Sequence, residues 1–209
     1  TTTANITAKS LTVSGITASN KTYDGSTNVT LTGTAVYSGL VSGDTFDGTY
    51  TGAFSDKNAG VGKTVTITSS YSGADVSNYS VTDQSSTTAN ITAKSLTVSG
   101  ITASSKTYDG STSATLDPSL VVYSGLVTGD TFDGTYTGVF SNANVGTGKT
   151  VNITPSYSGA DVNNYSVTDQ STTTANITAK ALTATASTSN KTYDGGTTAS
   201  TTLTFTGLV

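Results

Sequence analysis

The chain repeats itself at long intervals. The stretch Thr2–Ser19 returns letter for letter at Thr87–Ser104, and the motif KTYDG begins at Lys21, Lys106 and Lys191. Each KTYDG motif follows the one before it by 85 residues, which is well beyond the roughly 20 to 50 residues of solenoid or propeller units. The sequence therefore predicts a tandem array of small domains, each with its own hydrophobic core.

The register of the repeat divides the chain into four parts. Residues 10–94 and 95–180 are two complete repeats, which we call copy 1 and copy 2. Residues 1–9 match the end of a repeat and are expected to be the closing strand of a preceding one. Residues 181–209 are expected to be the opening strands of a following repeat. This register predicts that both ends of the chain lie within a longer array.

Composition argues against several classes of function. The net charge is −4, from 9 basic and 13 acidic residues, so we expect no binding to nucleic acid and no membrane insertion in this segment. The chain contains no Cys, which excludes disulfides, and no His, which is the commonest general base near neutral pH. We therefore expect no enzyme activity, no catalytic residue and no cofactor-binding residue, and each domain must be stabilised by core packing.

Apolar residues alternate with polar ones throughout copy 1. Leu11 and Val13 show this pattern, as do Val65 and Ile67, and Asp-Gly or Gly-rich segments separate such runs. No window has the apolar spacing of a long helix. About six or seven short strands per copy predict an all-β fold, either a small antiparallel β-sandwich or a β-grasp-like module. The side chains expected to be buried are Leu11, Val29, Leu31, Tyr50, Phe54, Val65, Ile67 and Tyr79.

The two copies are joined without a flexible linker. Residues 87–99, which span the boundary, include no Gly, no Pro and no run of charges. The last strand of one copy is therefore expected to pass almost directly into the first strand of the next. Such joints predict modules arranged as an extended rod, in which each copy adds roughly 30 to 40 Å at about 3.3 Å per residue of strand.

Paired carboxylates suggest a candidate metal site. Asp44 and Asp47 lie beside a turn, and Asp130 and Asp133 are their counterparts in copy 2. Calcium prefers six to eight oxygen ligands, and these segments lack the regular acidic spacing of an EF-hand. The four residues are weak candidates for a structural calcium site, and turn-forming Asp is the alternative interpretation.

Two further motifs allow both a chemical and a structural interpretation. The segment Gly60–Thr64 ends like a phosphate-binding loop, but Lys57 stands where that motif requires Gly, which favours a turn that leads into a strand. The triplet Tyr23-Asp24-Gly25 could bind a ligand. We instead expect Tyr23 to pack and to donate a hydrogen bond, while Asp24 and Gly25 form a tight turn.

Two lysines are candidates for a covalent crosslink within each copy. Lys63 and Lys149 precede apolar strands, and a bond from a buried lysine to an Asn or Asp side chain would replace the missing disulfides. Such a crosslink also needs a nearby acid, and only Asp could supply it here. Surface lysines that flank a strand are the alternative interpretation.

Four motifs in a fixed order resemble a known type of repeat. They are KTYDG, the run Asn58–Val65 with its counterpart Asn144–Val151, the segment Asn78–Asp83 with its counterpart Asn164–Asp169, and the junction ANITAK. Together they are similar to the YDG and related MBG repeats. Those repeats are mostly β modules found in tandem in large bacterial secreted and surface adhesins, including filamentous-haemagglutinin-like proteins.

The resemblance implies a structural role at the bacterial cell surface or in the extracellular space. The chain is expected to be a stalk or fibre module of an adhesin or surface filament, which projects an adhesive region and bears tension. The expected partners are neighbouring repeats or subunits of the same protein, while other domains would bind host or matrix glycans or proteins. The alternative is that each repeat is itself a low-affinity glycan- or protein-binding module in biofilm or cell adhesion.

Overall fold

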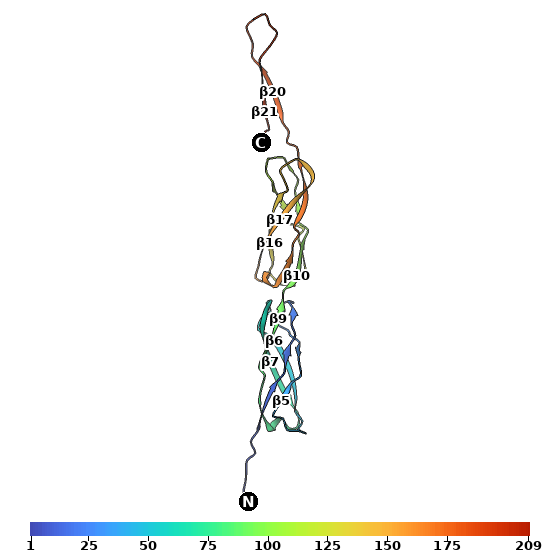
Figure 1. Ribbon diagram of the computed structural model, residues 1–209, viewed down its shortest axis with the longest axis vertical. Coiled ribbons are helices and arrows are strands. Elements are labelled where there is room, and N and C mark those ends of the chain that lie inside the picture. Colours follow the sequence, from blue (N-terminus) through green and yellow to red (C-terminus); the bar gives the residue numbers. More distant parts are fainter. The chain divides into compact units, whose positions relative to one another are not determined.

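A computed structural model describes residues 1–209, and it consists almost entirely of β-strands and their connections (Figure 1). The strands of copy 1 are β1 (Lys9–Ser14), β2 (Thr17–Ala18), β3 (Lys21–Thr22), β4 (Leu31–Thr32), β5 (Val36–Ser38), β6 (Asp47–Phe54), β7 (Gly60–Ser72), β8 (Tyr79–Thr82) and β9 (Ser86–Thr92). The strands of copy 2 are β10 (Lys94–Ser99), β11 (Thr102–Ala103), β12 (Lys106–Thr107), β13 (Ser113–Ala114), β14 (Leu116–Asp117), β15 (Val122–Ser124), β16 (Asp133–Phe140), β17 (Gly146–Ser158), β18 (Tyr165–Thr168) and β19 (Thr172–Thr178). A final hairpin consists of β20 (Thr183–Thr188) and β21 (Thr201–Thr206).

Helical structure is confined to one short turn in each copy. These are the three-residue 3₁₀-helices η1 (Val76–Asn78) and η2 (Val162–Asn164). Neither is long or apolar enough to cross a membrane. The expectation of an all-β fold built from tandem modules is confirmed.

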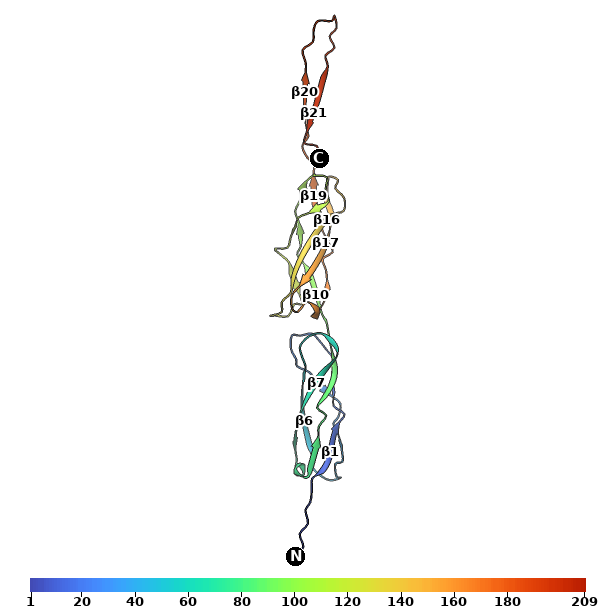
Figure 2. The ribbon, with the colours of Figure 1, turned by 90° about the vertical axis from the view of Figure 1, so that its left-hand side faces the viewer.

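Copy 1 has two main sheets. One has the strand order β3-β9-β7-β6 and the other β5-β1-β8, and a short ladder joins β2 to β4. The longest pairing is antiparallel, between β6 and β7, which run side by side from Asp47↔Ser72 to Phe54↔Val65 (Figures 1 and 2). Because successive side chains point to opposite faces, this register places Phe54, Val65 and Ile67 together on the buried face.

Two strand pairs of copy 1 are parallel, which a purely antiparallel β-sandwich, one of the two expected alternatives, does not include. β1 pairs with β8 from Lys9↔Tyr79 onwards, and β3 pairs with β9 from Lys21↔Ile91 onwards. Parallel neighbours need a long connection, and here most of the copy lies between the paired strands. Alternation in the sequence could not reveal this, because it reports the face of a residue and not the direction of the neighbouring strand.

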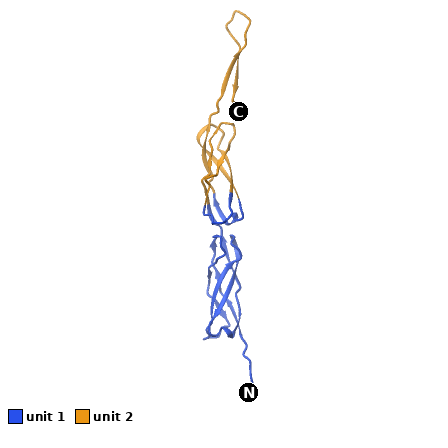
Figure 3. Cartoon of the chain, turned by 180° about the vertical axis from the view of Figure 1, so that it is seen from behind, with its two compact units in different colours: residues 1–96, 124–133, 158–168 blue, residues 97–123, 134–157, 169–209 orange.

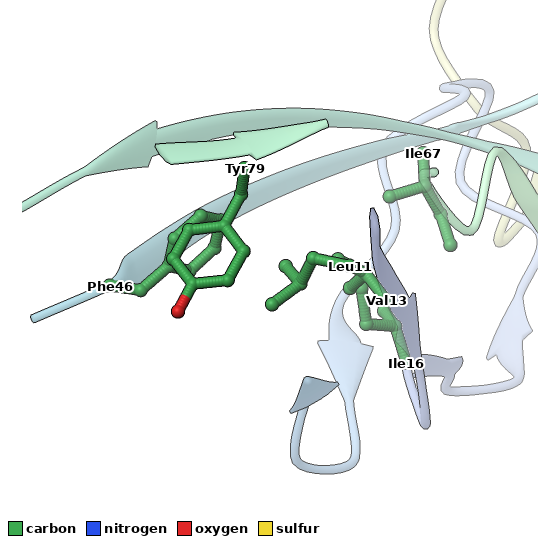
Figure 4. Packing of buried hydrophobic residues seen from close by; sticks show 6 residues of the cluster. All are labelled: Leu11, Val13, Ile16, Phe46, Ile67 and Tyr79. Carbon is green, nitrogen blue, oxygen red and sulfur yellow. The ribbon is translucent and has the colours of Figure 1, made fainter. Parts of the chain in front are cut away.

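One cluster of buried side chains lies between β1, β7 and β8. Figure 4 shows the rings of Phe46 and Tyr79 next to each other, with Leu11 pointing towards them. The two rings meet edge to face, with centroids 5.7 Å apart, a favourable arrangement for an aromatic pair. The buried set is completed by Val13, Ile16 and Ile67.

A second cluster is built on the long hairpin and its neighbour. In copy 2 its buried members are Phe140, Val151, Ala175 and Ile177. The corresponding positions of copy 1 are buried as well, namely Phe54, Val65, Ala89 and Ile91. The core therefore recurs position by position in the two copies.

Most of the side chains expected in the core of copy 1 are buried. The confirmed residues are Leu11, Phe54, Val65, Ile67 and Tyr79. Val29, Leu31 and Tyr50 are only half-buried. Tyr23, which was not in the expected core, is 1% exposed, and its surroundings are described below.

The contacts of the chain define two compact units (Figure 3). The first contains residues 1–96 together with two segments of copy 2, residues 124–133 and 158–168. The second contains residues 97–123, 134–157 and 169–209. Loops of copy 2 thus pack in the same unit as copy 1, and their contacts form the site described next.

Candidate functional site

The KTYDG motif folds into a closed turn. The Lys21 ammonium lies 2.7 Å from Asp24 Oδ1, and the same oxygen accepts a hydrogen bond of 2.9 Å from the Ser26 amide. The turn is built in the same way in copy 2, where Lys106 lies 2.8 Å from Asp109. The hydrogen bond from Lys106 is the main cause that lowers the pKa of Asp109 to about 2. The aspartate of the motif is therefore a structural residue that holds the turn closed.

Glycine is required at the end of this turn for two reasons. The φ angles of Gly25, Gly110 and Gly195 are 78°, 77° and 75°, in the left-handed region that other residues avoid. The space is also limited, because a Cβ atom on Gly25 would lie 3.0 Å from Val127 Cγ1. On Gly110 it would lie 2.8 Å from Val209 Cγ1. In both cases the turn contacts a valine of the following repeat.

The tyrosine of the motif is buried against copy 2. Tyr23 is 1% exposed, and its hydroxyl donates a hydrogen bond of 2.7 Å to Asp130 Oδ2. The hydroxyl of Tyr165 donates to the same oxygen at 2.6 Å. The rings of Tyr23 and Tyr165 meet edge to face with centroids 5.6 Å apart. The tyrosine of one repeat is thus paired with a tyrosine and an aspartate of the next.

A lysine of copy 1 bridges two carboxylates of copy 2. Lys57 Nζ lies 3.1 Å from Asp130 Oδ1 and 2.8 Å from Asp161 Oδ1. The side chains of Asp130 and Asp161 are only 3% and 11% exposed, whereas that of Lys57 is 38% exposed. The ammonium also lies 5.9 Å from the centroid of the Tyr23 ring. We call Tyr23, Lys57, Asp130, Asp161 and Tyr165 the junction cluster.

The junction cluster stabilises the ionised forms of its aspartates. The pKa of Asp161 is lowered, first by the hydrogen bond from Lys57 and then by the one from the Thr131 amide. Burial acts to raise the pKa of Asp130, but the hydrogen bonds from Tyr165, Tyr23 and Lys57 outweigh it and lower that pKa. Burial, followed by the hydrogen bond to Asp130, raises the pKa of Tyr23. Near neutral pH the cluster therefore contains carboxylates and neutral tyrosines.

A buried amide completes the junction. Asn164 is 2% exposed, and its Oδ1 accepts a hydrogen bond of 2.9 Å from the Ala59 amide. Its Nδ2 donates to Asn58 Oδ1 at 3.3 Å. Because buried polar groups are expensive to leave unpaired, these contacts fix the loop of copy 1 that carries Lys57.

The other end of copy 2 has a related but different arrangement. Tyr108, the counterpart of Tyr23, is half-buried, and Ala143 stands where copy 1 has Lys57. Tyr108 lines a pocket of about 270 Å³ together with residues of the following segment, including Leu182. The lysine bridge is therefore particular to copy 1, while the position of the tyrosine beside the next repeat recurs.

The carboxylates considered for calcium have other partners or lie at the surface. Asp44 Oδ2 accepts a hydrogen bond of 2.5 Å from Tyr79, and Asp130 belongs to the junction cluster. Asp47 and Asp133 are the exposed first residues of β6 and β16. No group of three or more His, Cys, Asp or Glu residues is placed to hold a metal ion. Calcium binding stays a prediction.

The two lysines considered for a crosslink lie beside side chains of the required type. Lys63 Nζ forms an ion pair of 2.6 Å with Asp56, and Lys149 Nζ donates a hydrogen bond of 2.6 Å to Asn142. Both partners are exposed, which fits non-covalent contacts at the surface. The crosslink stays a prediction that an intact-mass measurement would test. The segment Gly60–Thr64 begins β7, as the structural interpretation of that motif required.

Sequence reasoning identified only part of this site. It expected Tyr23 to pack and to donate a hydrogen bond, and the structure confirms both. It gave Asp130 a different role and missed Lys57, Asp161 and Tyr165. A usable signal was the spacing Asp-x-x-Asn-Tyr, which ends at Tyr165 and has a counterpart in copy 1. The pairing of that motif with KTYDG of the other copy became visible only in three dimensions.

Comparison with protein-family models identifies the repeats. The model of the YDG domain matches residues 7–89 and again residues 92–175. Comparisons with curated proteins and with solved structures give no significant match. The chain belongs to the YDG domain family and contains two of these domains in tandem.

Proposed function

We propose that the chain is a structural stalk or fibre module of a bacterial extracellular adhesin or surface filament, which projects an adhesive region and bears tension. The observation that carries this proposal is the burial of Tyr23 against Asp130 and Tyr165. A domain that binds the next domain through a buried, hydrogen-bonded side chain is suited to building a continuous array. Catalysis does not require such a contact.

The connection between the copies also supports this proposal. Only Ala93 separates β9 from β10, so the chain leaves one copy in a strand and enters the next in another. Repetition of one domain adds length without adding a new active-site cleft. The absence of Cys and Met removes the side chains that are most easily oxidised outside the cell.

Small-angle scattering on recombinant arrays of increasing copy number tests the stalk role. We expect the maximum dimension to increase by roughly 30 to 40 Å with each added copy, because strands of about 10 residues extend by that amount. A dimension that grows only as the cube root of the mass would contradict a stalk. The same proteins on a glycan array provide the control, since specific binding to an isolated pair of copies would favour the binding-module alternative.

The proposed location needs its own test. An antibody raised against this chain should label intact, unpermeabilised cells of the source bacterium or its culture medium. Labelling that requires permeabilised cells would contradict the extracellular location and leave the array geometry as a separate question.

A further inference from the structure

Two tyrosines connect the main sheets of each copy. In copy 1, Tyr37 lies on β5 and Tyr50 on β6, and these strands belong to different sheets. The Tyr50 hydroxyl donates a hydrogen bond of 3.0 Å to the Tyr37 hydroxyl. In copy 2 the hydroxyls of Tyr123 on β15 and Tyr136 on β16 lie 3.1 Å apart. We call these two contacts the tyrosine pairs, and each of them links one sheet of its copy to the other.

A glycine leaves the space in which the two hydroxyls of each pair meet. A Cβ atom on Gly48 would lie 2.3 Å from the hydroxyl oxygen of Tyr50 and 2.6 Å from that of Tyr37. On Gly134 of copy 2 the corresponding distances are 2.3 Å and 2.8 Å. Only glycine, which has no Cβ atom, allows so close an approach. Each tyrosine pair therefore depends on a glycine in the neighbouring backbone.

A third tyrosine and a carboxylate extend each pair. The rings of Tyr50 and Tyr71 meet edge to face, with centroids 6.2 Å apart. The Tyr71 hydroxyl donates a hydrogen bond to Asp83, which is exposed. Copy 2 repeats the arrangement, with ring centroids 6.3 Å apart and Asp169 as the acceptor. Each copy thus contains three neighbouring tyrosines and a carboxylate placed to take up a proton from one of them.

Tyrosine is the most easily oxidised type of side chain in this chain. Cys, Met and Trp are absent, whereas 11 tyrosines are present. Burial, followed by the hydrogen bond to Tyr37, raises the pKa of Tyr50, so this hydroxyl is protonated near neutral pH. Oxidation of a neutral phenol releases a proton together with the electron. The Asp83 carboxylate beside Tyr71 provides an acceptor for such a proton.

We propose that each tyrosine pair is a site of oxidative crosslinking, at which a dityrosine bond joins Tyr37 to Tyr50 in copy 1 and their counterparts in copy 2. Phenoxyl radicals couple at a ring carbon next to the one that carries the hydroxyl, so contact between two hydroxyls holds the reactive carbons close together. Such positioning favours coupling within a pair over coupling between distant tyrosines. The inference goes beyond the stalk role, because it concerns a covalent modification of each copy.

The oxidant in this reaction is hydrogen peroxide, activated by a peroxidase. Each of the two phenols loses one electron and one proton and becomes a phenoxyl radical. The radicals form one carbon–carbon bond, and the hydrogen atoms on the two bonded carbons move to the oxygens, which restores both phenols. Hydrogen peroxide accepts the two electrons and two protons and is reduced to two molecules of water. The chain therefore loses two hydrogen atoms for each crosslink.

The crosslink has the structural effect that a disulfide has in other small domains. It closes the loop between residues 37 and 50, and so it constrains the unfolded chain. It also joins β5 to β6, so the two sheets of copy 1 stay connected when the packing between them is lost. The chain contains no Cys that could form a disulfide in this place.

Oxidation of the full chain in dilute solution, with hydrogen peroxide and a peroxidase, tests the proposal. A crosslink should form in each copy, seen as the loss of two hydrogen atoms per copy in intact mass and as the blue fluorescence of dityrosine. A protease that cuts before Asp separates the tyrosines of each pair, at Asp44 and Asp47 in copy 1 and at Asp130 and Asp133 in copy 2. Mass spectrometry of the digest should then find the two peptides of each pair still joined. The urea midpoint should be higher after oxidation than before it.

Single substitutions identify the tyrosines that react. Tyr37→Phe keeps the ring and removes the hydroxyl, so it should abolish the crosslink of copy 1 and leave that of copy 2 as an internal control. Tyr123→Phe should give the opposite result. Gly48→Ala keeps both tyrosines of copy 1 but separates their hydroxyls, so it should lower the yield of that crosslink, and circular dichroism establishes that its fold is retained. Tyr108→Phe, which changes a half-buried tyrosine outside the pairs, should leave both crosslinks unchanged.

Three outcomes would overturn the proposal. They are no dityrosine in the oxidised chain, dityrosine that joins other tyrosines or separate molecules in place of the pairs, and an unchanged mass loss in Tyr37→Phe. Tyr23 and Tyr165 provide a comparison, because their rings also meet but are almost fully buried, and we expect no bond between them. Oxidation in urea should lower the yield of both paired products, because unfolding removes the positioning. Failure of this test would leave the stalk proposal unchanged, because scattering from covalently linked copies tests that role independently.

Discussion

The hydroxyl of Tyr23 donates a hydrogen bond of 2.7 Å to Asp130, which lies 107 residues further along the chain. The donor belongs to the KTYDG motif of copy 1, and the acceptor precedes β16 in copy 2. A motif that looks local in the sequence therefore acts between repeats. The stability of each copy should depend partly on its neighbour, and the predictions below measure that dependence.

Removing the Tyr23 hydroxyl should weaken the junction. Tyr23→Phe keeps the ring and leaves the buried Asp130 carboxylate with one donor fewer. We expect the free energy of unfolding to fall by about 1 to 3 kcal/mol, measured in urea. Tyr108→Phe is the matched control, and its effect should be smaller because Tyr108 is only half-buried. If both variants lose the same free energy of unfolding, the hydrogen bond from Tyr23 to Asp130 does not stabilise the junction.

Removing the lysine bridge should reduce the sensitivity of the junction to salt. Lys57→Ala copies the residue that copy 2 has at this position, Ala143. At about 1 M salt the Debye length is about 3 Å, so the partly exposed ion pairs of Lys57 are screened. The unmodified chain should therefore lose more stability than the variant when salt is raised. If added salt lowers the free energy of unfolding of both proteins equally in urea titrations, this account is wrong.

Acid should weaken the junction. The folded state lowers the pKa values of Asp130 and Asp161, so their stabilising contribution is present above the ordinary carboxyl pKa of about 3.9. It is lost as the pH falls through the lowered values. We expect the urea midpoint to decrease below about pH 4. Asp130→Asn should show a smaller decrease, and this difference separates the junction from the other aspartates of the chain.

A methyl group at the YDG glycine should clash with copy 2. Gly25→Ala meets an unfavourable φ of 78° and Val127 at 3.0 Å, whereas Gly43→Ala meets a φ of 97° and open space. Gly25→Ala should be the more destabilising by about 1 to 3 kcal/mol, the usual range for overpacking. Adding Val127→Ala should recover part of this difference in urea unfolding. If Val127→Ala restores none of the lost stability, the destabilisation by Gly25→Ala arises from backbone strain in the turn and not from the contact with Val127.

Truncating a core side chain should destabilise mainly the copy that contains it. Phe54→Ala should destabilise copy 1 by roughly 3 to 5 kcal/mol, since the side chain is 3% exposed and lies on the long hairpin. Hydrogen exchange should then accelerate strongly in β7 and only slightly in β17. Phe140→Ala should give the opposite pattern. Equal acceleration in both strands would indicate one shared core.

Period-two alternation was sufficient to predict the fold class and most of the core. It placed Leu11, Val65 and Ile67 correctly, because each lies on a strand with one buried face. It overestimated the burial of Val29 and Leu31, which are half-buried on or beside the very short β4. A pattern of alternation does not show whether another layer covers that face, and so it could not separate half-buried from buried positions.

The junction cluster was less accessible to sequence reasoning. Tyr23 could be assigned a structural role from the chemistry of Tyr-Asp-Gly turns, but its partner could not. Asp130 and Asp161 lie in two different loops, and the fold brings both to Lys57. The charge of Asp130 had suggested metal binding or turn formation, and Asp161 had been given no role, because a single sequence does not show that a lysine from another repeat lies between them.

The parallel pairing of β1 with β8 has a mechanical consequence. The chain enters copy 1 through β1 and leaves it after β8 and β9. A pull on both sides of the copy would therefore slide β1 and β8 past each other along their length. The evenly spaced hydrogen bonds of this parallel ladder, from Lys9↔Tyr79 to Thr12↔Thr82, would be loaded in shear. They would have to break together, whereas a hairpin pulled from its open end unzips one bond at a time.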